Sequence, residues 1–247
     1  GASTGSPTLP RRPRRRARAV RCPLPDAPPP SAAQTPCPPD TSPRPRGSRH
    51  RRSLNVVDVL RALEQLGGIG STIQLRAQGA RDPDLRRAVE LGAAIRVRRG
   101  WYATRRTPDA VLLAVRAGGR LSCVSALALQ GIWVLNDDRA HVALPAHGHC
   151  YRRDVVAHWV PDPGEGYPME SALTSLSRLA SCGSLAAVVV AADSIINLGK
   201  ASEEEVLAVL YASARGRAAA RWVDGSAQSG LETLARLSLS RRNVRMR

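Results

Sequence analysis

The sequence predicts a mainly helical α+β chain with three kinds of segment. Apolar residues recur at three- and four-residue spacing along most of the chain, which indicates amphipathic helices. A few short stretches instead alternate between apolar and polar residues, as strands do. The first 53 residues show neither pattern. We therefore expect a disordered N-terminal arm, a small helical domain with a hairpin, and a larger helical region with a small sheet.

Residues 1–53 form the predicted arm. Thirteen of the 19 prolines and twelve arginines lie there, against only two acidic residues. Because large aliphatic side chains are almost absent, the segment cannot bury enough apolar surface to offset the cost of ordering it. The arginines between Arg11 and Arg18 suit nonspecific contact with a polyanion. A passive tail, or translated sequence upstream of the true start, is the alternative interpretation.

A compact domain is predicted over residues 54–106, beginning with two helices. The first is indicated by apolar residues at helical spacing, namely Val56, Val57, Leu60, Leu63 and Leu66. The second should begin at Ser71, with Ile73 and Leu75 facing inward. The segment GGIG at 67–70 lacks the spacing and the preceding strand of a phosphate-binding loop, so we interpret it as a turn between these helices.

A third helix and a hairpin complete this domain. Asp82 followed by Pro83 is typical of an N-cap and a first helical position. The apolar residues of the predicted helix are Leu85, Ala88, Val89 and Leu91. Residues 95–97 and 101–103 then alternate around a basic turn that ends at Gly100, and Trp101 and Tyr102 are expected to anchor the hairpin in the core. Three short helices and a basic-tipped hairpin are the plan of a winged helix-turn-helix.

Arginines are the candidate functional residues of this domain: Arg81, Arg86, Arg87, Arg96, Arg98 and Arg99. With the apolar residues of the third helix inward, Arg86 and Arg87 should project to solvent. Guanidinium groups make two-pronged contacts with phosphate and guanine, so this pattern predicts double-stranded DNA as a partner. The alternative is a solvated basic face on a domain used for protein contact.

The motifs of this region carry a family resemblance. The run GGIGSTIQLRAQGARDPDLRRAVELGAAIRVRRGWYA resembles the N-terminal winged-helix domain of AbiEi-type abortive-infection antitoxins. The later segments LSCVSALALQGIWVL, HVALPA and DVVAHWV also fit, so the resemblance spans about three quarters of the chain. It implies a bacterial, cytoplasmic transcriptional regulator or antitoxin, with a cognate toxin and a second copy of the chain as candidate partners.

Residues 107–227 are predicted to form an α+β region that binds a partner. Helices are expected after Pro108, around 122–130, 170–181 and 185–196, and after the capping-box sequence at Ser202. Strands are expected at 141–144 and 155–160, paired in one hairpin. Histidines and a cysteine gather nearby, namely His141, His147, His149, Cys150 and His158. Their crowded spacing matches no common metal site, so we expect no metal and no other cofactor.

Residues 228–247 resemble the first helix of a Vsr-like endonuclease domain. In that family a glutamate of this helix helps to bind the catalytic metal, and Glu232 matches its position, with Arg236 one turn later. The strands with the remaining acidic residues and lysine do not follow, so the resemblance implies a truncated, inactive nuclease remnant. The alternative is structural, since Ser229 and Glu232 have the spacing of a capping box.

Composition bounds the remaining possibilities. The formal net charge is +17, and Lys200 is the only lysine, so arginine supplies nearly all the positive charge. Such a charge favours polyanionic partners, although a GC-rich genome would also enrich arginine. The five cysteines are scattered and form no CxxC pair, which argues against a disulfide framework or a zinc finger. No serine-nucleophile motif and no apolar run of membrane-spanning length occur, so an enzyme and a membrane protein are both disfavoured.

Overall fold

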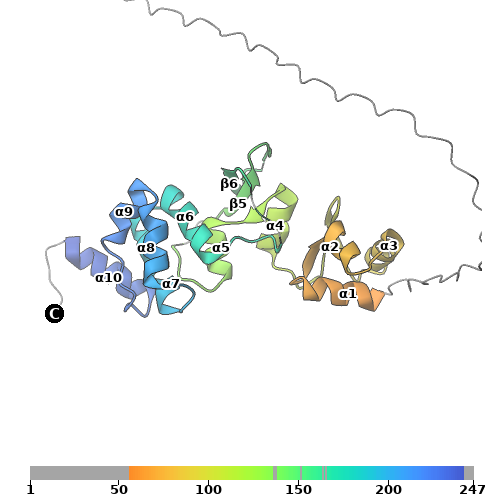
Figure 1. Cartoon of the computed structure of the whole chain (residues 1–247), viewed down its shortest axis with the longest axis horizontal. Helices are drawn as coiled ribbons and strands as arrows, with labels where there is room; N and C mark the ends of the chain where they lie inside the picture. Colours follow the sequence, from red (N-terminus) through yellow and green to blue (C-terminus); the bar gives the residue numbers. More distant parts are fainter. Residues whose placement is uncertain (1–55, 136–137, 151, 163, 165, 242–247) are drawn as a thin grey trace, which may run out of the picture. The chain divides into compact units, whose positions relative to one another are not determined.

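The computed structural model describes residues 56–135, 138–150, 152–162, 164 and 166–241. By contacts the chain divides into residues 1–49 and 50–247, and the arm predicted at 1–53 lies outside the described residues. The described part is a mixed α+β structure with two small sheets (Figure 1). None of its helices has the length and apolar character needed to cross a bilayer.

The first group of elements lies between residues 56 and 103. It consists of α1 (Val56–Gln65), β1 (Ile69–Ser71), α2 (Thr72–Ala77), α3 (Asp82–Glu90), β2 (Ile95–Arg98) and β3 (Trp101–Ala103). The three helices pack around a core that includes Val59, Leu63, Leu75 and Leu85, all at most 1% exposed. The predicted hairpin of β2 and β3 is confirmed as an antiparallel pair. As predicted, Trp101 and Tyr102 are partly buried against the neighbouring cores.

Several local predictions for this group were wrong. The turn predicted at 67–70 is limited to residues 67–68, and residues 69–71 form the strand β1, which pairs with β3 to give the sheet order β1-β3-β2. A Cβ at Gly70 would lie 2.6 Å from Leu66 Cδ1, so glycine at this position lets the Leu66 side chain pack against β1. Ile73 is 80% exposed while Leu75 is fully buried. Residues two apart point about 200° apart around a helix, so they cannot share one face.

Two helix boundaries also differ from the prediction. The N-cap of α3 is Arg81, not Asp82, and Pro83 lies within the first turn. The carboxylate of Asp84 accepts the backbone N–H of Arg81, which fixes the start of the helix one residue earlier. At the other end, Leu91 follows the last turn and is 63% exposed, instead of facing the core. On α1, Val57 is likewise 61% exposed.

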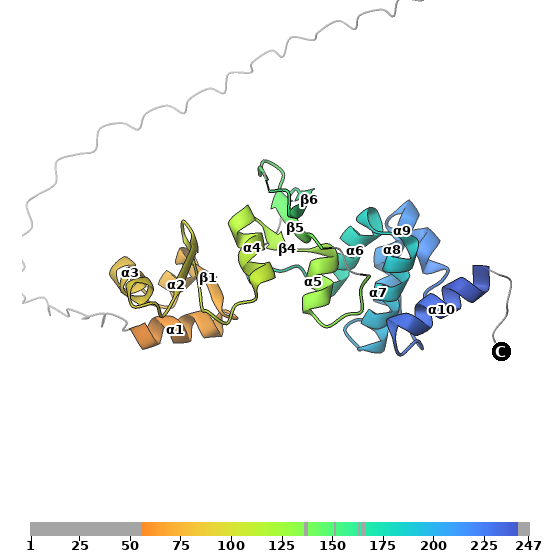
Figure 2. The same ribbon diagram turned by 180° about the vertical axis from the view of Figure 1, so that it is seen from behind.

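The second group surrounds a three-stranded sheet of order β4-β5-β6. Its elements are α4 (Asp109–Ala117), β4 (Arg120–Leu121), α5 (Cys123–Leu129), β5 (Ala140–Pro145), β6 (Val155–Val160) and α6 (Ala172–Cys182). Both α4 and α5 contact β5, and α6 packs along α5 (Figure 2). Val111, Leu112 and Leu121 share a buried cluster with Ile69 and Val97 of the first group, so this core crosses the boundary predicted at residue 106.

Strands β5 and β6 are both present as predicted, but they do not form a hairpin. They pair in parallel, from Ala140 opposite Val155 to Pro145 opposite Val160. A parallel pair requires the chain to return to the start of β5 before β6 begins. The connecting residues 146–154 can reach about 30 Å when extended, which exceeds the length of β5. The alternation of apolar and polar residues is the same in both arrangements, so it could not reveal the strand direction.

The third group is helical: α7 (Leu185–Asn197), α8 (Glu203–Tyr211), α9 (Ala214–Ala220) and α10 (Gly230–Arg241). The capping box predicted at Ser202 is confirmed, whereas α9 was not predicted. The buried carboxylate of Asp193 on α7 accepts bonds from Thr233 Oγ1 at 2.7 Å and Arg236 at 2.6 Å, both on α10. Leu237 joins the same core. Consequently, the boundary predicted at residue 228 does not separate two cores.

Candidate functional site

The exposed face of α3 carries two of the predicted arginines. Leu85 and Ala88 are buried on one side of this helix, at 1% and 0% exposed. Arg86 and Arg87 follow Leu85 directly, so the helical rotation places their side chains outside the core, and both are exposed. This outcome agrees with the sequence prediction for these two residues.

The first turn of α3 is acidic and its carboxylates are already paired. Asp82 accepts two bonds from Arg76 Nη2 at 2.8 and 2.9 Å. Asp84 is buried and accepts the backbone N–H of Arg81 at 2.9 Å and Arg81 Nε at 3.3 Å. Carboxylates therefore already occupy the positive end of the helix dipole, and they would repel a phosphate there. Arg81 is thus the weakest of the six candidates for a phosphate contact.

The hairpin presents its arginines in two environments. All three are exposed: Arg96 and Arg98 flank the buried Val97, and Arg99 precedes the turn at Gly100. Arg98 differs in its contact with Trp101: its Cζ lies 6.0 Å from the centre of the Trp101 ring, a cation–π contact. Partial burial lowers the pKa of Arg98, although the guanidinium remains charged at neutral pH. Arg98 therefore contributes to packing as well as to charge.

Arg81 is paired with Asp84 and Arg98 is in contact with the Trp101 ring. Four of the six candidate arginines remain as available cations: Arg86, Arg87, Arg96 and Arg99. Across residues 56–241 as described, no side-chain hydrogen bond or ion pair involves them. All four are exposed. A charge that is not neutralised by a neighbour and not shielded by burial is free to bind an external anion. The available basic groups of the first element group thus lie on α3 and on the β2–β3 hairpin.

The sequence reasoning missed Arg105. Its Nε donates to the carbonyl oxygen of Gly92 at 3.0 Å, although the two residues are thirteen positions apart. Gly92 lies in the turn between α3 and β2, so this bond connects the segment after the hairpin to that turn. Only the pair Arg105–Arg106 in the sequence could have hinted at another basic position, because a side-chain bond to a backbone oxygen leaves no residue pattern.

Glu232 serves as a helix cap in the structure. Its carboxylate accepts the backbone N–H of Gln228 at 2.8 Å and the hydroxyl of Ser229 at 3.2 Å. In return, the Ser229 hydroxyl accepts the backbone N–H of Glu232 at 3.3 Å. These contacts agree with the capping interpretation of the sequence, and they occupy both oxygens of the residue predicted as a nuclease remnant.

The predicted group of histidines divides into two. His141 and His158 lie together, with Nδ1 of His141 3.1 Å from Nε2 of His158. His147, His149 and Cys150 are not part of this pair. Two cysteines from elsewhere in the chain join it, and we call Cys123, His141, His158 and Cys182 the Cys–His cluster. The sequence prediction missed both cysteines, because they are separated from the histidines by intervening elements.

Two members of the Cys–His cluster have strongly shifted pKa values. Burial, followed by the neighbouring Cys182, raises the pKa of the Cys123 thiol to about 12. Burial, followed by the proximity of His141, lowers the pKa of His158 to about 4. The thiol of Cys123 is therefore protonated and the ring of His158 uncharged at neutral pH when no cation is present.

Comparison with known proteins leaves the family of this chain open. No family model matches it, and no curated protein matches its sequence. Among solved structures it is similar to the RV2827C protein from Mycobacterium tuberculosis, with 17% identity and a TM-score of 0.35. That similarity covers 74% of this chain and 80% of the other.

Proposed function

We propose that this protein binds double-stranded DNA through α3 and the β2–β3 hairpin, and acts as a transcriptional regulator of the abortive-infection antitoxin type. The observation that carries the proposal is the set of four exposed arginines without internal partners on these two elements, Arg86, Arg87, Arg96 and Arg99. Phosphate backbones attract such groups through the release of condensed counterions.

The order of elements supports the same proposal. A helix, a short strand, two helices and a two-stranded hairpin follow one another from α1 to β3. In a winged helix-turn-helix this order would make α3 the recognition helix and the hairpin the wing. The acidic first turn of α3 argues for readout from the middle of that helix, where Arg86 and Arg87 lie, instead of from its N-terminus.

Residues 107–227 have the partner-binding role in this proposal. Regulators that read two half-sites gain affinity as dimers, so a second copy of the chain and a cognate toxin are the candidate occupants. Trp133 and Trp159 in this region are 51% and 57% exposed, which makes them the first side chains to substitute in a pairing assay.

The test is direct. The full chain is incubated with fragmented DNA from its own genome at low ionic strength, and the bound fragments are recovered and sequenced. Enrichment of a fragment upstream of its own gene, confirmed by gel shift against random duplex, is the expected result. A chain that fails to bind any duplex at low ionic strength refutes the proposal.

A further inference from the structure

The Cys–His cluster is assembled from four different elements. Cys123 begins α5, His141 lies on β5, His158 on β6, and Cys182 ends α6. In the parallel register His141 is opposite Val156, so His158 is two residues further along β6 and shares the face of His141. The packing of α6 along α5 brings Cys182 to the same place.

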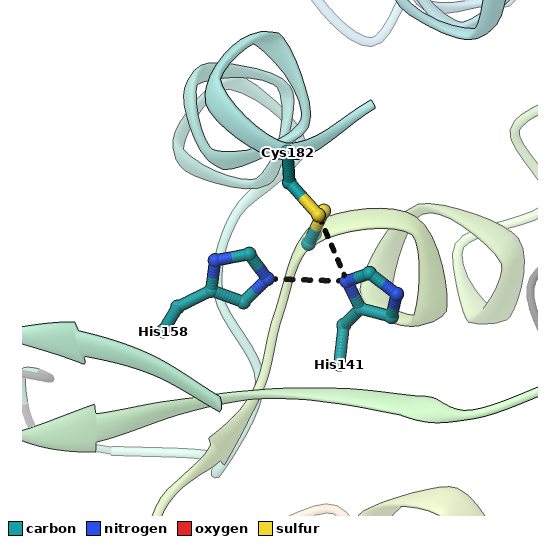
Figure 3. Close-up of side chains that lie close together, drawn as sticks. His141, His158 and Cys182 are labelled. Carbon is teal, nitrogen blue, oxygen red and sulfur yellow. Dashed lines mark hydrogen bonds between the residues drawn. The ribbon is translucent and has the colours of Figure 1, made fainter. Parts of the chain in front are cut away.

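Two distances within the Cys–His cluster match those of a tetrahedral coordination sphere. His141 Nδ1 lies 3.1 Å from His158 Nε2 and 3.7 Å from Cys182 Sγ (Figure 3). With Cys123 Sγ included, all four ligand atoms lie within 4.8 Å of one another. With ordinary zinc–nitrogen and zinc–sulfur bond lengths, tetrahedral geometry puts two nitrogens about 3.3 Å apart and nitrogen and sulfur about 3.6 Å apart. The side chains are thus already arranged to hold one ion.

Backbone and side-chain hydrogen bonds hold two of these residues in place. Ser122 N–H donates to the carbonyl oxygen of His141 at 2.9 Å, and His141 N–H donates to Ser125 Oγ at 2.9 Å. Cys123, between these two serines, has a φ of +51°, a left-handed conformation that is rare for a residue with a side chain. In addition, the hydroxyl of Ser122 donates to the buried carboxylate of Glu170, which Arg178 approaches at 3.5 Å. These contacts therefore help to position Cys123 and His141.

The geometry points to a structural Zn²⁺ site formed by Cys123 Sγ, His141 Nδ1, His158 Nε2 and Cys182 Sγ. Two sulfurs and two imidazole nitrogens in a tetrahedral arrangement suit Zn²⁺. Four protein ligands leave no open position for water or substrate, which is the pattern of a structural site, not a catalytic one.

Charge balance favours the same ion. On binding, the two thiols release their protons to solvent, and the two thiolates neutralise the charge of the divalent cation while the imidazoles stay neutral. The site therefore has no net charge, which matters because Cys123 and His141 are 0% and 2% exposed. No electron is transferred, so no oxidant or reductant is needed. The bound ion would connect β5 and β6 to α5 and α6 directly.

The experiment measures metal in the full chain, purified under reducing conditions without chelator and without an affinity tag that binds metal. Elemental analysis should give one zinc per chain. After removal of zinc, titration with Co²⁺ should produce the strong visible bands of tetrahedral cobalt together with a thiolate charge-transfer band. Less than a tenth of an equivalent of zinc, or cobalt spectra without thiolate bands, overturns the inference.

Matched variants identify the ligands. Cys182→Ser changes an exposed residue at the end of α6, so the fold should survive, and zinc affinity should fall at least tenfold. His158→Gln, from the partly exposed strand β6, should have the same effect. Cys150→Ser, a cysteine outside the Cys–His cluster, and His149→Gln should retain one equivalent. Equal zinc binding by Cys182→Ser and the parent chain refutes the site.

A disulfide is the competing outcome at the two sulfurs. Mass spectrometry of the chain purified under reducing conditions could show a mass two hydrogens lower than the reduced chain, with Cys123 and Cys182 in one crosslinked peptide. That result would show that the two sulfurs form a disulfide in place of the metal site. Thiol titration distinguishes the two, because the chain with zinc recovers both free thiols when a chelator and a denaturant are added.

Discussion

The salt dependence of DNA binding tests the proposed interface most sharply. The change is the double substitution Arg86→Ala and Arg87→Ala, which removes two exposed charges from α3 and leaves its buried Leu85 and Ala88 in place. Neither arginine has a side-chain partner among the described residues. The helix should therefore keep its structure, and the loss should appear in binding alone.

The magnitude follows from counterion release. Each phosphate contact contributes about 0.9 to the slope of log K against log salt concentration. If the four available arginines each contact one phosphate, the slope is about −3.6 for the parent and about −1.8 for the double variant. Between about 50 and about 200 mM salt, affinity then falls about 150-fold for the parent and about 12-fold for the variant.

Fluorescence anisotropy of a labelled duplex at five salt concentrations measures both slopes. The control is Arg116→Ala with Arg221→Ala, which removes the same charge from exposed positions on α4 and after α9. The control should retain the parent slope. Equal slopes for the parent and the α3 variant, or an equal reduction in the control, would show that α3 does not face the phosphates.

Three further predictions concern stability. Chelation of zinc should lower the Tm in a thermal scan of the parent more than that of Cys182→Ser, since saturation at about 100 times Kd contributes about 2.7 kcal/mol and a tenfold weaker site about 1.4 kcal/mol; the same loss in both chains would contradict a role for Cys182. Hydrogen bonds from the backbone and side chain of Ser202 lower the pKa of Glu205. Because the pKa of Glu205 is depressed in the folded state, its contribution to the free energy of unfolding is present above the ordinary pKa and is lost as pH falls through the folded pKa. In urea denaturation, the free energy of unfolding of Glu205→Gln should depend less on pH in that window than that of the parent, and an equal pH dependence would contradict this role of Glu205. Leu75→Ala should cost about 2–5 kcal/mol of unfolding free energy, whereas Ile73→Ser should stay within about 0.5 kcal/mol; comparable losses would mean that Ile73 is buried.

Much of the secondary structure was predictable because local signals determine it. The capping box at Ser202 and the basic turn before Gly100 correctly located a helix start and a hairpin. The strand β1 was not predictable, since its three residues become a strand only by pairing with β3, thirty or more residues later. The prediction that Ile73 faces the core was wrong for a simpler reason: Ile73 and Leu75 are two residues apart and cannot lie on the same face of a helix.

The two candidate sites differed in how far the sequence could locate them. Arg86 and Arg87 were found because their neighbours on one helix define the buried side. The Cys–His cluster could not be found that way, because its members lie on four elements and the parallel direction of β6 decides which histidines meet. The crowded local spacing of His147, His149 and Cys150 drew attention to residues that do not belong to it.

The ion pair between Asp193 and Arg236 has a consequence for any attempt to shorten this chain. Removing α10 would take the cation and the hydroxyl of Thr233 away from Asp193, which is 1% exposed in the intact chain. Leaving one member of a buried pair behind costs about 3–5 kcal/mol, and a typical domain has only about 5–15 kcal/mol to lose. A fragment intended to isolate the helices α5 to α9 should therefore extend through residue 241, because the final helix completes their interior.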